Sequence, residues 1–346
     1  MTSKQRVLNA VNHKTTDRLP YDFWAEQPVT ERLIKELKLP FHTDELRSHF
    51  KTDLRYVGAP MTKFILKPDA GGYYTDPWGV GFKRVYFQNG YQDTAVVNPL
   101  AKAETAKDVY NHSWPDPKDY DFGGVAGYCE KYKDFALIGG NGHFFCSIAD
   151  MRGYEQFLID LYEENEIAHA MMEKMCEYWL SYNEQLFEAS GGKLDILYLA
   201  DDYSSQNGLL FSPECYNATI RPYMQRLMNQ GKRMGCKIFF HSCGAVRKLI
   251  PSLIDMGVDI LNPIQIRAAG MNPVELAAEY GKDLCFHGGV DLQQTLSFGS
   301  PQDVKKEIIM LKETLGKHGG YIVCSGHTIT PDVPIENIYA IYETNV

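Results

Sequence analysis

A histidine and a cysteine lie two residues apart, at His241 and Cys243, where an apolar run gives way to Gly244. The run Lys237–Phe240 has the pattern of a β-strand, and side chains two apart on a strand point to the same side of a sheet. An imidazole nitrogen and a thiolate sulfur are ligands that zinc prefers, and a catalytic zinc takes about three protein ligands and keeps one position open. The spacing therefore predicts two ligands of a catalytic metal.

A second apolar run, Tyr321–Val323, leads into Cys324 and, three residues later, His327. We expect the two strand ends to meet around one metal, with Cys324 or His327 as a third ligand. A His-x-Cys pattern alone is weak, because it arises by chance in roughly one of four or five chains with this histidine and cysteine content. Its position at the end of a predicted strand makes a role as metal ligands more plausible for His241 and Cys243.

Strand-like runs alternate with helical patterns along most of the chain, which is typical of a parallel sheet with helical crossovers. Eight runs predict strands: 18–23, 53–57, 135–138, 195–200, 237–240, 259–263, 284–287 and 321–324. This number predicts a TIM (β/α)8 barrel of ~250 residues with additions. The additions are an N-terminal helix and an insertion between the second and third strands, at about 60–122, in one domain over 1–346. A doubly wound open sheet is the alternative, although no G-x-G-x-x-G follows the first strand.

Three expected helices begin with the same signal, a capping residue followed by proline and soon by an acid. The signals start at Ser212, Asn272 and Ser300. Serine or asparagine accepts a bond from a free amide of the first turn, proline lacks an amide that would need a partner, and the acid favours the helix dipole. The first of these helices is expected to continue to about Met234.

Polar residues follow the predicted strands, and in a parallel barrel these strand ends lie on the face that carries the chemistry. We expect Asp201, Asp202 and His287 to be catalytic. The Asp201–Asp202 pair could equally cap a loop by binding backbone amides. The expected substrate-binding residues are Tyr203, Gln206, His143, Asn262, Gln265 and Asp291.

Composition excludes several classes of protein. The 346 residues have a net charge of −9 and show no basic cluster, which argues against nucleic-acid binding. No apolar run approaches the ~20 residues that span a bilayer, so we expect no membrane contact. The eight cysteines include no C-x-x-C pair and no secretory signal precedes them, so reduced thiols and a cytoplasmic location are expected.

Several short motifs together resemble the uroporphyrinogen decarboxylase superfamily over nearly the whole chain, and the resemblance implies a TIM barrel. The motifs are Ser3–Asn12 with Asp17–Pro20, Asp76–Gly79, Trp114–Pro117, Ala200–Asp202 with Ser212–Glu214, His241–Gly244, Gly288–Asp291 and Ile329–Asn337.

The superfamily has two well-known branches. Decarboxylases hold the propionates of a porphyrinogen with N-terminal arginines and an aspartate, whereas the corresponding stretch here, Pro20–Glu26, has no arginine. Cobalamin-linked methyltransferases resemble the chain at His241–Gly244, which implies a zinc on the His-x-Cys motif and on a late cysteine. That late position aligns better with His327 than with Cys324. The resemblance thus implies His327 as the third ligand and leaves Cys324 as a bystander or a fourth ligand.

The resemblance implies a zinc-dependent methyltransferase that moves a methyl group between a corrinoid and a thiol or other small acceptor. The corrinoid would be methylcobalamin or would be carried by a separate corrinoid protein, and a homodimer is one expected assembly. Two alternatives stay open. One is a metal-free decarboxylase of a tetrapyrrole or smaller acid, and the other is a non-catalytic barrel that binds a corrinoid or a partner.

Overall fold

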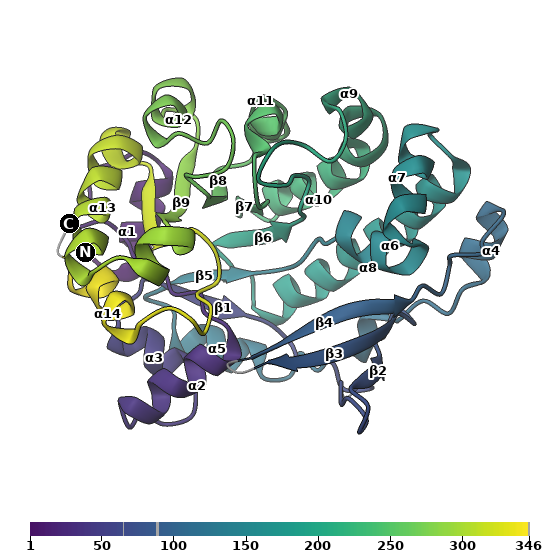
Figure 1. Cartoon of the computed structure of the whole chain (residues 1–346), viewed down its shortest axis with the longest axis horizontal. Coiled ribbons are helices and arrows are strands. Elements are labelled where there is room, and N and C mark those ends of the chain that lie inside the picture. Colours follow the sequence, from purple (N-terminus) through teal and green to yellow (C-terminus); the bar gives the residue numbers. More distant parts are fainter. Residues whose placement is uncertain (65, 88–89, 345–346) are drawn as a thin grey trace.

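The centre of the computed structural model is a curled, seven-stranded parallel sheet (Figure 1). The model describes residues 1–64, 66–87 and 90–344. The strand order follows the chain without reversal, whereas a doubly wound sheet would reverse it. The prediction of an α/β fold with a parallel sheet is confirmed, and the curl is consistent with a TIM-like barrel. Its strands are β1 Leu54–Val57, β5 Ala136–Gly139, β6 Ile196–Ala200, β7 Lys237–His241, β8 Ile260–Ile264, β9 Cys285–Val290 and β10 Tyr321–Ser325.

Residues 18–23, the first predicted strand, form no extended strand in the structure. A single parallel bridge joins Tyr21 to Val323 of β10. The amide of Asp22 donates to the Val323 carbonyl at 2.9 Å, and the amide of Asp53 donates to the Tyr21 carbonyl at 2.8 Å. This short segment therefore links β10 to the residue that precedes β1.

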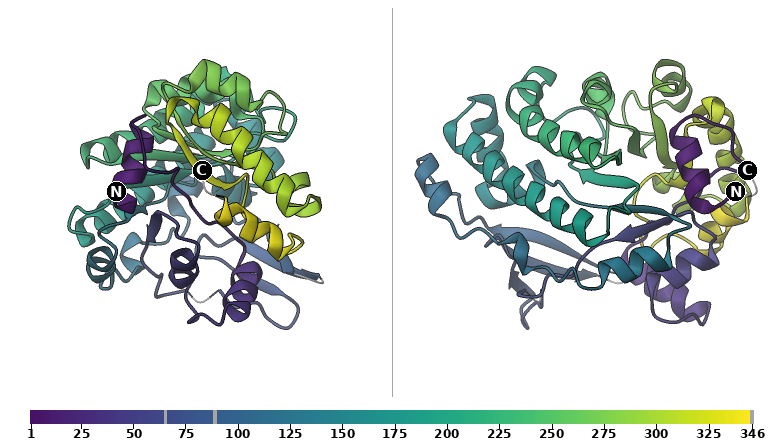
Figure 2. Two further views of the ribbon diagram at one scale, coloured as in Figure 1. Left: turned by 90° about the vertical axis from the view of Figure 1, so that its left-hand side faces the viewer. Right: turned by 180° about the vertical axis from the view of Figure 1, so that it is seen from behind.

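Helices surround the outside of the curled sheet (Figures 1 and 2). None of the described helices is long and apolar enough to cross a membrane. Up to β6 the helices are α1 Ser3–Val11, α2 Gln27–Glu36, α3 Thr43–His49, α4 Ala106–Asn111, η1 Pro117–Asp119, α5 Val125–Lys131, α6 Phe145–Arg152, α7 Tyr154–Tyr162 and α8 Glu166–Ala189. After β6 they are α9 Pro213–Cys215, η2 Tyr216–Ile220, α10 Arg221–Arg233, η3 Val246–Leu249, α11 Ile250–Met256, α12 Pro273–Tyr280, η4 Leu292–Leu296, α13 Pro301–Thr314, η5 Leu315–His318 and α14 Ile335–Glu343.

A small antiparallel sheet lies between β1 and β5 in the sequence. It consists of β2 Tyr73–Thr75, β3 Gly81–Phe87 and β4 Gly90–Val97. It falls within the stretch 60–122 that was expected to be an insertion, of which residues 65 and 88–89 lie outside the described part of the chain.

The expected long helix from Ser212 to about Met234 is present, with one irregular turn inside it. Ser212 does cap it, accepting from the Cys215 amide at 3.1 Å. The helix then widens into a π-helical turn, η2, before α10. Pro222 has no amide to donate to the preceding turn, and its ring crowds that turn, which accounts for the local widening.

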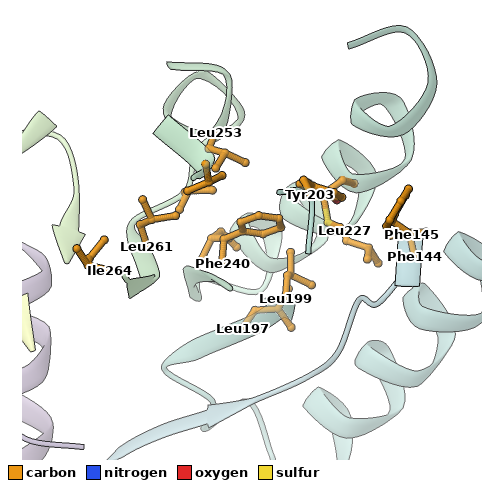
Figure 3. Close-up of a cluster of buried hydrophobic side chains, with 14 of the residues drawn as sticks. Phe144, Phe145, Leu197, Leu199, Tyr203, Leu227, Phe240, Leu253, Leu261 and Ile264 are labelled. Carbon is orange, nitrogen blue, oxygen red and sulfur yellow. The ribbon is translucent and has the colours of Figure 1, made fainter. Parts of the chain in front are cut away.

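Two layers of apolar side chains pack against the two faces of the sheet. Outward-facing residues such as Leu197, Leu199, Phe240 and Leu261 pack against the surrounding helices (Figure 3). Inward-facing residues form a separate cluster with Val7 and Val11 of α1, and they are Leu54, Ala136, Ile138, Ile196, Phe239, Ile260, Cys285 and Ile322. Helix α1 thus contributes to the inner core, and in four of the strands the inward position two residues further along holds a histidine, an asparagine or a cysteine.

Candidate metal centre and its buried hydrogen-bond chain

Site residues occupy the inward positions at the carboxyl ends of the strands. In four strands, the residue two positions after an inner-core residue is His241, Asn262, His287 or Cys324. Because side chains two apart share a face, these four point toward the inside of the curled sheet. The alternation within each strand thus brings together residues that are far apart in the chain.

Asp202, His241 and Cys243 form a compact group at the end of β6 and β7. Their candidate ligand atoms all lie within 4.8 Å of one another. The Cys243 Sγ is 3.3 Å from His241 Nε2, and the Asp202 Oδ1 is 3.5 Å from the same nitrogen. The Asp202 Oδ1 also accepts the Cys243 amide at 2.8 Å. One nitrogen, one sulfur and one carboxylate oxygen thus face a common point, and such a donor set suits zinc.

The protonation states of this group follow from burial and from its internal bonds. Burial raises the pKa of the Cys243 thiol well above its ordinary value, and the Asp202 charge raises it further. Burial also acts to raise the pKa of Asp202, but its interactions with a protonated His241 and with Cys243 outweigh it and lower this pKa to about 2. Without a metal the thiol therefore keeps its proton at neutral pH, whereas the carboxylate is charged.

Asn262 determines which nitrogen of His241 carries the proton. The Asn262 Oδ1 lies 2.6 Å from His241 Nδ1, and a carbonyl oxygen can only accept, so Nδ1 is the donor. The lone pair of a neutral His241 is then on Nε2, the nitrogen that faces Cys243 and Asp202. A partner that fixes the ring and its tautomer in this way is typical of metal-ligating histidines.

The hydrogen bonds continue from Asn262 into the interior. Its Nδ2 lies 2.7 Å from His287 Nδ1, and His287 Nε2 lies 3.0 Å from Asp22 Oδ2. Tyr56 donates its hydroxyl to the same Asp22 oxygen at 2.5 Å. Each link has one donor and one acceptor if His287 is neutral with its proton on Nε2. Four elements are therefore joined by one buried chain of polar side chains, from β7 through β8 and β9 to the segment before α2.

Burial alone would raise the pKa of Asp22, but the hydrogen bonds from His287 and from Tyr56 lower the pKa overall. Both Asp22 and His287 are fully shielded from solvent. The buried carboxylate is thus stabilised in its charged form.

Trp24 lies against this chain of side chains. Its ring stacks on His241 with centroids 5.6 Å apart and an angle of 23° between the planes. Its Nε1 donates to Asp22 Oδ2 at 3.1 Å and also contacts the Tyr56 hydroxyl. The indole therefore contacts both ends of the hydrogen-bond chain.

Two of the predicted site residues, Asp201 and Tyr203, are buried in the surrounding structure. Asp201 accepts the amides of Phe144, Phe145 and Cys146 at 3.2, 2.6 and 3.2 Å, and so caps α6. Burial raises the pKa of Asp201 to about 7, although these amides oppose the rise. Tyr203 is fully buried among aromatic rings, and its hydroxyl has no partner among the described residues.

Other predicted substrate-binding residues line a cavity of about 130 Å³. The cavity lies between the loops after β6, β8, β9 and β10 and is lined in part by Gln206, Gln265, Asp291 and His327. Gln206 donates to Gln265 at 2.8 Å, and the Gly244 amide donates to the same Gln265 oxygen at 2.9 Å. Asp291 pairs with Arg267 and caps η4. The cavity therefore borders the loop that carries Cys243.

The remaining three predicted residues lie at different distances from the metal group. Burial, and then the proximity of His241, lower the pKa of His143 to about 4 and also lower that of His327. Cys324 is fully buried, and its sulfur lies 3.8 Å from Ser325 Oγ. Among the described residues neither His327 nor Cys324 belongs to the compact group, so the identity of a late ligand stays a prediction.

Sequence reasoning missed Asp22, Trp24 and Tyr56, and it did not include Asp202 among the candidate metal ligands. One signal existed: Asp22 and Trp24 lie two apart at the end of the first predicted strand, as His241 and Cys243 do at the end of another.

Comparison with known proteins gives a consistent family relationship. The profile of the family described as uroporphyrinogen decarboxylase (URO-D) matches residues 87–345. A uroporphyrinogen decarboxylase of Anaeromyxobacter sp. is 24% identical over 192 residues, which cover 56% of this chain and 51% of that protein. A methylated-thiol–coenzyme M methyltransferase of Methanosarcina mazei is 27% identical over 179 residues, covering 51% and 43%. The matches thus span about half the length of these curated relatives.

The fold itself matches a solved structure over nearly its full length. A methyltransferase from Methanosarcina mazei superimposes with a TM-score of 0.71 at 17% identity, covering 99% of this chain and 97% of the other. Since the family profile matches most of the chain, this protein belongs to the uroporphyrinogen decarboxylase family.

Proposed function

We propose that this protein is a zinc-dependent methyltransferase that moves a methyl group between a corrinoid and a thiol or another small acceptor. The observation that carries the proposal is the compact group of Asp202, His241 and Cys243, with the tautomer of His241 set by Asn262. The names of two relatives from Methanosarcina mazei support methyl transfer as the reaction class.

The donor set fits zinc. His241 would supply Nε2, Cys243 its sulfur and Asp202 a carboxylate oxygen, and three protein ligands leave a position for an acceptor. When bound, zinc would act as a Lewis acid that stabilises the anion of an acceptor thiol. His327, which lines the adjoining cavity, is proposed as the late ligand or as a contact to the acceptor.

The residues of the chain prepare this site in three ways. Asn262 keeps the proton of His241 on Nδ1 and leaves Nε2 free. Asp202 carries a negative charge across the neutral range, because its pKa is about 2, and so favours a cation beside it. The cavity lined by Gln206, Gln265 and His327 would admit and orient the acceptor.

A decarboxylase that works without a metal would not use the ligand set of Asp202, His241 and Cys243. We therefore prefer methyl transfer. The corrinoid is proposed as a co-substrate, free or on a separate protein. We also propose that the chain acts as one domain; a homodimer and a cytoplasmic location stay predictions.

The test is the metal content of the anaerobically purified protein, for the wild type and for His241→Ala and Cys243→Ala. We expect about one zinc per chain in the wild type, because three donors converge, and loss of zinc in both variants. Cys215→Ala is the matched control, since its sulfur contacts Thr219 rather than the metal group.

Methyl transfer from methylcobalamin to a thiol is then assayed on the same samples. We expect activity in the wild type and in the control only. A wild type that holds no zinc after reconstitution, or that keeps its activity after chelation, would exclude the proposal and favour the decarboxylase.

A further inference from the structure

A second pocket, of about 220 Å³, shares no lining residue with the cavity already described. It is lined by Phe23, Trp24, Ala25, Thr30, Thr43, Arg47, Tyr56 and Thr328. The lining comes from the segment before α2, from α2 and α3, from β1 and from the loop after β10. The volume would hold several water molecules, which is enough for one small polar group.

Arg47 is the charged residue of this pocket, and part of its guanidinium has no partner. Its Nε is buried and makes no hydrogen bond within the described part of the chain. Its Nη1 donates to Asp44 at 3.1 Å, and its guanidinium lies 4.6 Å from the centre of the Tyr56 ring. Asp44 also accepts the Tyr128 hydroxyl at 2.8 Å, so this carboxylate serves two donors. A buried donor without a partner is rare and calls for an explanation.

The other polar side chains that line the pocket carry no negative charge. Thr30, Thr43 and Thr328 add hydroxyl groups to its lining, and none of the eight lining residues is acidic. Two buried carboxylates lie beside the pocket: Asp44 pairs with Arg47, and Asp22 already accepts from Tyr56, Trp24 and His287. A guanidinium with hydroxyl groups around it is suited to bind an oxyanion such as a carboxylate.

The pocket and the metal group share one wall. Trp24 lines the pocket, and its ring stacks on His241. Thr328, at the opposite side, directly follows His327, which lines the cavity next to the metal group. The Arg47 pocket and the metal group are therefore neighbours, with Trp24 between them.

We propose that the Arg47 pocket binds a carboxylate group of the small-molecule substrate while its acceptor atom is directed to the metal group. The binding of the carboxylate depends only on Arg47 and its neighbours, whereas its place in methyl transfer rests on the proposed function. The substrate class is then a thiol with a carboxylate a few bonds away.

The experiment compares 3-mercaptopropionate with the neutral 3-mercapto-1-propanol on the zinc-loaded protein, by isothermal titration calorimetry. We expect the carboxylate to bind at least tenfold more tightly. Arg47→Gln should abolish this preference while its affinity for the neutral thiol stays within twofold. Arg233→Gln, which removes an exposed positive charge from α10, is the matched control and should keep the preference.

Two further measurements keep the test decisive. Thr43→Val should lower the affinity for 3-mercaptopropionate about threefold without touching the Asp44 bond, so it tests the pocket even if Arg47→Gln unfolds. Propionate, titrated into the zinc-free protein, should bind to the wild type and not to Arg47→Gln. Propionate binding without any thiol binding would retain this pocket and overturn the proposed methyl transfer. Equal affinities of the two thiols in the wild type, or an unchanged preference in Arg47→Gln, would overturn the proposal that the Arg47 pocket binds a carboxylate.

Discussion

At the scale of single residues, Asn262 has the largest effect on the chemistry available to the site. It accepts the Nδ1 proton of His241 and donates to His287, so its two ends act on two different histidines. A hydrogen bond to the second nitrogen of a ligating histidine both orients the ring and raises its basicity.

We expect Asn262→Ala to lower the affinity for zinc by about 10- to 100-fold, because His241 loses the partner that fixes its tautomer. Asn262→Asp should retain most of the affinity, since a carboxylate still accepts the Nδ1 proton. Competition with a chelating dye measures both variants. Asn229→Ala, on α10, is the control, and equal affinities of Asn262→Ala and the wild type would show that the bond has no such role.

The two candidates for a late ligand can be separated by substitution. Cys324 lies outside the compact group and its sulfur is fully buried, so we expect Cys324→Ala to change the affinity for zinc less than twofold. His327→Ala should lower it by at least tenfold if the imidazole completes the site. A loss of zinc in Cys324→Ala alone would instead assign the late position to the sulfur. Both are measured by the same competition.

At the scale of elements, much of the architecture could be predicted from the pattern of apolar residues. Seven of the eight predicted strands are present, with ends within two residues of prediction except at β9, which continues to Val290. The eighth, at 18–23, forms only a bridge at Tyr21, since the residues around it bond to β10 and to Asp53 at isolated points. The pattern of apolar residues in a sequence indicates which side chains are buried. It does not indicate how many backbone hydrogen bonds form with the neighbouring strands.

The site could be predicted only in part, for a similar reason. His241 and Cys243 share a strand end, so a local pattern identifies them. Asp22 meets His287 and Tyr56 only through the curled arrangement of the sheet, and neither aspartate nor tyrosine as a residue type distinguishes a buried hydrogen-bond partner from a surface residue. Arg47 lies on a helix whose sequence gives no sign of the pocket beside it.

Asp201 and Asp202 show how neighbours can take different roles in different elements. Asp201 caps α6 with three amide bonds, so we expect Asp201→Ala to lower the free energy of unfolding by about 2 kcal/mol. The affinity for zinc should stay within twofold in protein that remains folded. Urea unfolding measures the stability, with Asp283→Ala, an exposed position, as the control. An unchanged stability would mean that the cap is dispensable.

At the scale of the whole molecule, the bond between Asp22 and His287 connects the N-terminal segment to β9, residues 265 positions apart. The segment that carries Asp22 also bonds to β10 and to the residue before β1, so this carboxylate lies where the two ends of the parallel sheet approach each other. Removal of this carboxylate should therefore lower the free energy of unfolding of the whole fold rather than loosen a single helix.

We expect Asp22→Asn to lower the free energy of unfolding by about 2 kcal/mol at pH 7, since hydrogen bonds to a charged group are lost. Folding lowers the pKa of Asp22, so its contribution is present above the unfolded value of about 4 and is lost as the pH falls below it. The difference between the wild type and the variant should therefore shrink from pH 6 to pH 3 in urea unfolding. A difference that is constant across this range would contradict a charged Asp22.

The position of Trp24 has a thermodynamic consequence. One indole contacts His241 on the metal side and lines the Arg47 pocket, so a ligand that shifts the ring at one place alters the surroundings of the other. Linkage is reciprocal: the factor by which zinc changes the affinity for a carboxylate equals the factor by which the carboxylate changes the affinity for zinc. The fluorescence of Trp24 offers a readout of that coupling when it is compared with that of Trp24→Phe, since the chain has four tryptophans.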